Sequence, residues 1–255
     1  MIRTTDPGKV ISCIWILCVV LGTAVLVRAE RLPIKTYTTA DGLARDQASR
    51  IVRDSEGLLW FCTVEGLSRF DGYKFTNYGI DQGLPNRQVN DFLETRGGVY
   101  WVATQGGLSR FNPGAASQSS REGNRSHDPR FILYRLGDDA GSQAITALYE
   151  DQAGTVWCGT GGGLYRLDQK NGQWLASFVE LRRPGSPKLA VASIVVDRRG
   201  SVWISTWEAL YCRRLDGMTE RYATEAGLPS QNFTTSSLLE DREGKIWLGL
   251  NNGLY

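Results

Sequence analysis

Short apolar segments recur along the chain, each introduced by a turn and centred on a tryptophan. The turn has Asp or Thr at its first position and Gly at its fourth, and the tryptophan follows three positions later. Asp at the first position of a β-turn accepts a backbone N–H, and Gly at the fourth tolerates a positive φ. β-branched, aromatic and leucine residues surround the tryptophan, which favours strands. The copies run from Asp54 to Trp60, Thr95 to Trp101, Asp151 to Trp157, Asp197 to Trp203 and Asp241 to Trp247.

The copies repeat with a period that is typical of tandem architectures. Successive tryptophans are 41, 56, 46 and 44 residues apart, and four copies carry Thr three positions after the tryptophan. The tryptophan and its apolar neighbour point to opposite faces of a strand, so both faces of each sheet need a cover. Blades that sandwich one another meet this need. We therefore predict an all-β fold, a β-propeller of four-stranded antiparallel blades, with about five blades in residues 30–255.

The second copy illustrates the expected blade. Its four strands are predicted at Val89–Leu93, Val99–Ala103, Leu108–Asn112 and Phe131–Arg135. An insertion at residues 114–129, rich in Ser, Gly, Arg and Asn, separates the last two strands and lengthens the spacing to the next tryptophan. This composition predicts a flexible surface loop.

Residues 1–29 have the pattern of a targeting segment. Arg3 and Lys9 precede an apolar run from Val10 to Val27, and Ala29 completes a small-residue cleavage pattern. We predict an N-terminal hydrophobic helix that acts as a signal peptide or as an N-terminal membrane anchor. Cleavage and retention both fit the sequence. Either outcome places residues 30–255 outside the cytoplasm, in the periplasm or anchored in the inner membrane.

Charge and cysteine content exclude several classes of protein. Without residues 1–29 the chain has 26 basic and 26 acidic residues with the two signs interspersed, which argues against nucleic-acid binding. Cys62, Cys158 and Cys212 have no metal-ligand spacing and are expected to be small buried hydrophobes. We therefore predict no metal and no cofactor.

The repeat, together with the loop Gly-Leu-Pro-Asn at residues 83–86, resembles the two-component regulator propeller repeats. These repeats form the periplasmic sensor part of hybrid histidine kinases and related regulators. The resemblance implies seven-bladed rings, often two in series, which are followed by an immunoglobulin-like domain, a transmembrane helix and the kinase. Several members of the family recognise oligosaccharides.

Relative to that family pattern, the sequence stops within the third strand of blade five, at Tyr255. The resemblance then predicts that downstream kinase or regulator domains are missing from this chain. It also predicts an incomplete ring, in which residues 33–37, the expected outer strand of a final blade, have no native partner. Unpaired strand edges promote association, so we expect self-association.

The resemblance implies that the chain is an extracytoplasmic ligand-sensing propeller region of a two-component signal transduction protein, with an oligosaccharide or another small periplasmic molecule as ligand. A propeller lyase, another periplasmic propeller enzyme and a purely structural protein-interaction propeller are the alternatives. Lyase chemistry is expected to need a histidine base and a metal, and the single histidine, His127, falls in the polar insertion. The chain is therefore not expected to be an enzyme.

Candidate ligand-binding residues lie off the repeat pattern, because packing explains the residues on it. Trp174 and Trp207 are the two off-pattern tryptophans after residue 29. Trp207 is expected in a turn at the end of a blade, where it would stack on a sugar ring while Glu208 hydrogen-bonds to it. The alternative is that Trp207 only covers the neighbouring blade.

Overall fold

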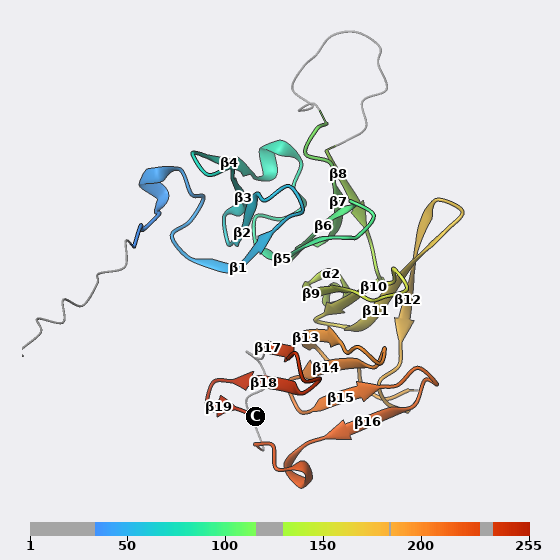
Figure 1. The fold of residues 1–255 in the computed structure, drawn as a ribbon. Coiled ribbons are helices and arrows are strands. Elements are labelled where there is room, and N and C mark those ends of the chain that lie inside the picture. Colours follow the sequence, from blue (N-terminus) through green and yellow to red (C-terminus); the bar gives the residue numbers. More distant parts are fainter. Residues whose placement is uncertain (1–33, 116–129, 184, 230–236) are drawn as a thin grey trace, which may run out of the picture. The chain divides into compact units, whose positions relative to one another are not determined.

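The computed structural model describes residues 34–115, 130–183, 185–229 and 237–255. They form five antiparallel sheets, which follow one another along the chain in Figure 1. Blade 1 contains β1 (Ala48–Arg53), β2 (Leu59–Thr63), β3 (Gly66–Phe70) and β4 (Phe75–Tyr78). Blade 2 contains β5 (Val89–Glu94), β6 (Tyr100–Thr104), β7 (Gly107–Phe111) and β8 (Phe131–Tyr134).

The remaining sheets repeat this order, although the described part of the last one has three strands. Blade 3 contains β9 (Ile145–Glu150), β10 (Val156–Thr160), β11 (Gly163–Lys170) and β12 (Gln173–Val179). Blade 4 contains β13 (Val191–Val196), β14 (Val202–Thr206), β15 (Leu210–Arg213) and β16 (Thr219–Tyr222), and blade 5 contains β17 (Ser237–Glu240), β18 (Ile246–Leu250) and β19 (Gly253–Leu254). A single helical turn, η1 (Thr39–Asp41), precedes blade 1, and three more, η2 (Ile80–Gln82), α2 (Ala140–Gln143) and η3 (Thr224–Ala226), lie between successive blades.

The prediction of an all-β propeller with five blades is confirmed. The first strands of successive blades, β1, β5, β9, β13 and β17, contact one another in chain order. The four expected strands of blade 2 are present with bounds shifted by one residue at most ends. The predicted N-terminal helix and residues 116–129 of the insertion lie outside the described residues. Within the described ranges, no helix has the length and apolar character needed to span a bilayer.

The shared geometry of blades 1, 3, 4 and 5 comes from a carboxylate that accepts two hydrogen bonds. In blade 1, Asp54 Oδ1 accepts the backbone N–H of Leu58 at 2.8 Å and Oδ2 accepts the indole N–H of Trp60 at 2.8 Å. Gly57 closes this turn with a φ of 87°, which costs glycine little. Blades 3, 4 and 5 repeat both contacts through Asp151, Asp197 and Asp241. The Asp therefore fixes both the turn and the orientation of the tryptophan ring.

Blade 2 departs from this geometry because Thr95 replaces the Asp. The Thr95 hydroxyl accepts the N–H of Val99 at 3.0 Å, which preserves the turn. The indole nitrogen of Trp101, however, is buried without a hydrogen-bond partner. A buried unsatisfied donor costs about 1–3 kcal/mol.

We therefore expect Thr95→Asp to stabilise the protein by about 1 kcal/mol, because the new carboxylate would accept the indole N–H of Trp101. Asp54 is equally buried in blade 1, so the position accepts an Asp. Urea unfolding of the variant measures the effect. Thr95→Asn is the matched control, since one amide oxygen replaces the two carboxylate oxygens. Equal stability of parent and Asp variant would contradict this explanation.

Apolar clusters fill the boundaries between the first four blades. Between blades 1 and 2, the ring of Trp60 stacks on Phe92 with centroids 4.7 Å apart and an interplanar angle of 17°. Trp101 occupies the corresponding cluster between blades 2 and 3, and Trp157 the one between blades 3 and 4. Cys62, Cys158 and Cys212 are free thiols buried in strands, as expected. Trp60, Trp101 and Trp157 thus lie in the cores of the first three blade boundaries.

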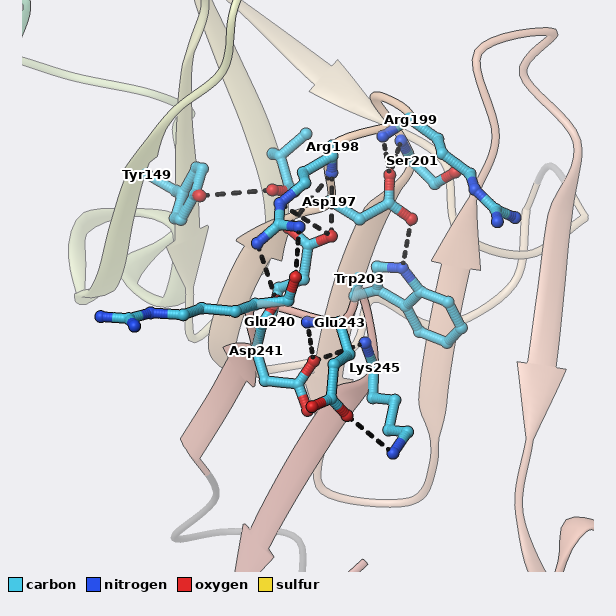
Figure 2. A network of polar contacts seen from close by, with 12 residues as sticks. Tyr149, Asp197, Arg198, Arg199, Ser201, Trp203, Glu240, Asp241, Glu243 and Lys245 are labelled. Atoms are coloured by element: carbon cyan, nitrogen blue, oxygen red, sulfur yellow. Dashed lines mark hydrogen bonds and ion pairs between the residues drawn. The ribbon is translucent and has the colours of Figure 1, made fainter.

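Polar clasps join the turn end of one blade to the next. We call a blade clasp the contact between the residue after the motif Asp or Thr and a Glu of the following blade. The N–H of Ser55 bonds to Glu94 at 2.6 Å, and the N–H of Arg96 bonds to Glu150 at 2.8 Å. In the third clasp, drawn in Figure 2, Arg198 contacts Glu240 and also donates to the carbonyl oxygens of Asp241 and Arg242 at 2.9 and 2.8 Å. Val196 replaces the Glu between blades 3 and 4, where its carbonyl accepts the Tyr149 hydroxyl at 3.2 Å instead.

A buried carboxylate on β5 connects three blades. Asp91 is 2% exposed, and Arg50 of blade 1 approaches its Oδ1 at 2.7 Å. Its carboxylate also accepts the backbone N–H groups of Phe92 and of Leu148 in blade 3, each at 2.8 Å. Burial raises the pKa of Asp91 from 3.8 to about 6, against the lowering effects of Arg50 and the two N–H groups.

Candidate functional site

The segment at residues 180–189, which links β12 of blade 3 to β13 of blade 4, borders two hollows. The larger is an open cleft of about 890 Å³ that this segment shares with the β14–β15 turn and the β15–β16 hairpin. Its lining includes Glu180, Arg182, Arg183, Ser186, Glu208, Tyr211, Arg213, Thr219 and Arg221. The smaller hollow, of about 240 Å³, lies between the segment and β11–β12. A cleft of the larger size suits a small ligand. We call it the blade 3–4 cleft.

A three-residue network holds the segment against blade 4. The Tyr211 hydroxyl donates to Glu208 Oε1 at 2.5 Å, and Arg182 forms an ion pair with the same oxygen. Arg182 Nε also donates to the Tyr211 hydroxyl at 3.3 Å. The Tyr211 side chain is fixed because the residue is 2% exposed and belongs to the core between blades 3 and 4.

The ionisation of this network follows from its geometry. Burial tends to raise the pKa of Glu208, but the hydrogen bonds from Arg182 and Tyr211 outweigh it and hold this pKa below its usual range. Burial and the bond to Glu208 raise the pKa of Tyr211. The hydrogen bond to Glu208 raises the pKa of Arg182. At neutral pH the network is therefore a carboxylate, a phenol and a guanidinium.

Further guanidinium groups lie around the cleft. Arg213 donates to the carbonyl of Gly217 at 2.8 Å, and Arg221 pairs with Glu225 at 3.1 Å. Arg183 follows Arg182 in the linking segment and also lines the cleft. Guanidinium groups bind carboxylate oxygens and accept no hydrogen bonds themselves, so the cleft offers several donors to a ligand that is rich in oxygen.

The structure places the three sequence-predicted site residues at different distances from this cleft. Glu208 lines it, whereas Trp207 lies in the adjacent β14–β15 turn, is 54% exposed and is not among the lining residues. Trp174 lies on β12, and its ring is perpendicular to that of Trp101, with centroids 5.3 Å apart, against the core between blades 2 and 3. Trp207 and Glu208 thus remain together as a candidate pair, and Trp174 has a packing contact.

The sequence interpretation did not identify Arg182, Arg183 and Tyr211. A usable signal for the two arginines was present, because they lie off the repeat pattern in a blade connection next to Pro184 and Gly185. Tyr211 lies on the pattern, and only its hydroxyl contact with Glu208 gives it a role at the cleft. Among the described residues, no group of three His, Cys, Asp or Glu side chains has the geometry of a metal site.

Solved structures with the same fold include extracellular domains of bacterial signalling proteins. The extracellular domain of the putative one component system BT4673 from B. thetaiotaomicron superposes with a TM-score of 0.62 at 22% identity, over 82% of this chain and 29% of that chain. The extracellular domain of the putative hybrid two component system BT3049 from the same organism gives a TM-score of 0.61 at 20% identity, over 83% of this chain and 27% of that chain. The chain thus spans less than a third of either structure.

An enzyme has a similar fold. Catalytically inactive H270A virginiamycin B lyase from Staphylococcus aureus, solved with quinupristin, has a TM-score of 0.56 at 15% identity, over 80% of this chain and 64% of that chain. No curated protein matches the sequence. At these identities the structural likeness shows the fold alone. The family model described as two component regulator propeller matches residues 140–162 and 227–252. Two segments of the chain, which contain parts of blades 3 and 5, are therefore similar to the two component regulator propeller repeat.

Proposed function

We propose that this chain is an extracytoplasmic ligand-sensing region of a two-component signal transduction protein and that the blade 3–4 cleft holds the ligand. The observation that carries the proposal is the network of Arg182, Glu208 and Tyr211, which joins the linking segment to blade 4 and borders a cleft of suitable volume. The family repeats and the extracellular domains with the same fold support a sensor outside the cytoplasm.

The geometry favours a ligand with many oxygen atoms, such as an oligosaccharide or another small periplasmic molecule. Arg182 and the other guanidinium groups would donate to ligand oxygens, and Trp207 at the adjacent turn would stack on a sugar ring. Glu208 already accepts bonds from Arg182 and Tyr211, so its role would be to position Arg182. A ligand that contacts both the linking segment and blade 4 would tighten this blade boundary.

Calorimetric titration against neutral and acidic oligosaccharides tests the proposal. For any oligosaccharide that binds, Trp207→Ala should weaken binding about three- to tenfold, and Arg182→Ala at least about tenfold. Leu215→Ala is the matched control, because Leu215 is 82% exposed in the hairpin loop of blade 4 and is absent from the cleft lining. A ligand whose affinity is unchanged by both cleft variants would contradict this placement of the site. Chemical turnover of a bound molecule would instead support the lyase class.

A further inference from the structure

Blade 4 departs from the repeat on the side that faces blade 3. In blade 2, Phe111 of β7 is paired with Phe131 of β8, and their rings stack with centroids 4.6 Å apart in the core between blades 1 and 2. Blade 1 has phenylalanines at the same two positions. Arg213 lies ten positions after the repeat tryptophan of blade 4, as Phe111 does in blade 2, and it is paired with Thr219. A guanidinium and a hydroxyl therefore replace two aromatic rings.

This replacement coincides with the blade 3–4 cleft. Tyr211, Arg213 and Thr219 all line the cleft. Alternate residues of a strand face the same side, so Arg213 shares with Tyr211 the side that packs toward blade 3. Arg221 on β16 lines the cleft as well, and its partner Glu225 is exposed outside the lining. The cleft thus lies where blade 4 lacks the apolar packing of blades 1 and 2.

The Arg213 side chain is held in place by its own hairpin. Its Nη1 donates to the carbonyl oxygen of Gly217 at 2.8 Å and to the Thr219 hydroxyl at 3.5 Å. Within the described part of the chain, its Nε and Nη2 have no hydrogen-bond partner, although the residue is half-buried. A guanidinium that is fixed in this way loses little conformational freedom when it binds a ligand.

The charges that line the cleft are not balanced. The lining contains four arginines and two glutamates, which leaves an excess of two positive charges. Arg182 and Glu208 form an ion pair, and the other glutamate, Glu180, is exposed. Arg183 and Arg213 form no ion pair with any described carboxylate. Guanidinium groups donate hydrogen bonds and accept none, so the cleft suits a ligand group that accepts hydrogen bonds and carries negative charge.

From this arrangement we infer that the blade 3–4 cleft selects an acidic ligand and that Arg213 binds its oxyanion, which is a carboxylate, a sulfate or a phosphate group. The inference rests on the proposed role of the cleft as the ligand site. Arg183 of the linking segment would approach the same oxyanion from the other side. The ligand would then join the segment to blade 4 through charge, in addition to the contacts expected for a neutral sugar.

Calorimetric titration with matched disaccharides tests this selectivity. Each set has one sugar skeleton in a neutral, a uronate, a sulfated and a phosphorylated form, so the acidic members separate the three kinds of oxyanion. In at least one set, an acidic member should bind at least about tenfold more tightly than the neutral member. This preference should shrink as the salt concentration rises, because salt screens the attraction between partly exposed charges.

Two arginines of the same hairpin provide the variant and its control. Arg213→Gln removes the charge but keeps an N–H donor for the carbonyl of Gly217, and it should reduce the acidic preference to about threefold or less. Arg214→Gln is the matched control, because Arg214 pairs with Glu220 and does not line the cleft. It should leave the preference unchanged. Circular dichroism checks that both variants are folded.

The possible failures of this inference and of the proposed site are distinguishable. A neutral disaccharide that protects residues 180–189 from hydrogen exchange and binds as tightly as its acidic counterparts would overturn the inference and leave the cleft as the ligand site. An acidic preference that survives in Arg213→Gln, or no binding of any acidic member up to about 10 mM, would overturn it too. Acidic ligands that bind without protecting residues 180–189 and 206–213 would contradict the ligand role of the cleft itself.

Discussion

Trp157→Ala should lower the free energy of unfolding by about 3–5 kcal/mol, because it removes a large aromatic ring from the core between blades 3 and 4. Trp157 is 7% exposed and packs in the cluster that contains Ile194, Val202 and Ile204. An aromatic side chain of this size buries about 150–250 Å², which sets an upper limit of about 4–6 kcal/mol. The change also leaves Asp151 without the indole N–H that it accepts at 2.8 Å.

Urea unfolding followed by circular dichroism measures this loss, and two other tryptophans serve as a graded comparison. Trp247→Ala should cost less because Trp247 is 37% exposed, and Trp207→Ala should cost about 0.5 kcal/mol or less because Trp207 is 54% exposed in a turn. If Trp157→Ala unfolds at the same urea concentration as the parent, the repeat tryptophans are not the cores of the blade boundaries.

Asp91→Ala should destabilise the protein by about 2–4 kcal/mol, because it leaves buried backbone donors without an acceptor. The N–H groups of Phe92 and Leu148 both donate to this carboxylate, and both residues are less than 5% exposed. Arg50 is half exposed, so water can replace its contact. Arg50→Ala is therefore the control, and it should cost less than Asp91→Ala. Equal losses would assign the stabilisation to the ion pair instead.

The same residue gives stability a pH dependence. The pKa of Asp91 is about 6 in the folded protein, above its ordinary 3.8, so the folded state binds this proton more tightly than the unfolded state does. The contribution is fully present below pH 3.8 and is lost as the pH rises through 6. The stability of the parent relative to Asp91→Ala should therefore fall between pH 4 and pH 7. A difference that grows with pH would mean that Arg50 outweighs burial.

The fold could be predicted from the sequence because the same local pattern occurs five times along the chain. One Asp-x-x-Gly turn before an apolar segment is weak information, but five copies in one register specify five blades. The turn chemistry predicted one hydrogen bond for the Asp. The second bond, to the indole nitrogen, spans six residues and depends on how the strand leaves the turn. It becomes visible only with both side chains in place, as does its loss at Trp101.

Only part of the candidate site could be predicted from the sequence. Glu208 was identified because it stands beside an off-pattern tryptophan, but its contact with Arg182 joins a blade connection to a turn of the next blade. No recurring pattern in the sequence points to such a contact. Asp91 was missed for a similar reason, since its partners Arg50 and Leu148 come from the two neighbouring blades. Trp174, another off-pattern aromatic residue, packs against the core between blades 2 and 3, and its role in ligand binding stays a prediction.

Hydrogen–deuterium exchange with a bound oligosaccharide tests the central proposal, the ligand role of the blade 3–4 cleft, most directly. The proposal predicts slower exchange in peptides that cover residues 180–189 and residues 206–213, with little change in blades 1 and 2. Arg182→Ala should abolish this protection at the same ligand concentration. Protection confined to blades 1 and 2, or protection of the cleft peptides that survives in Arg182→Ala, would contradict the proposed site.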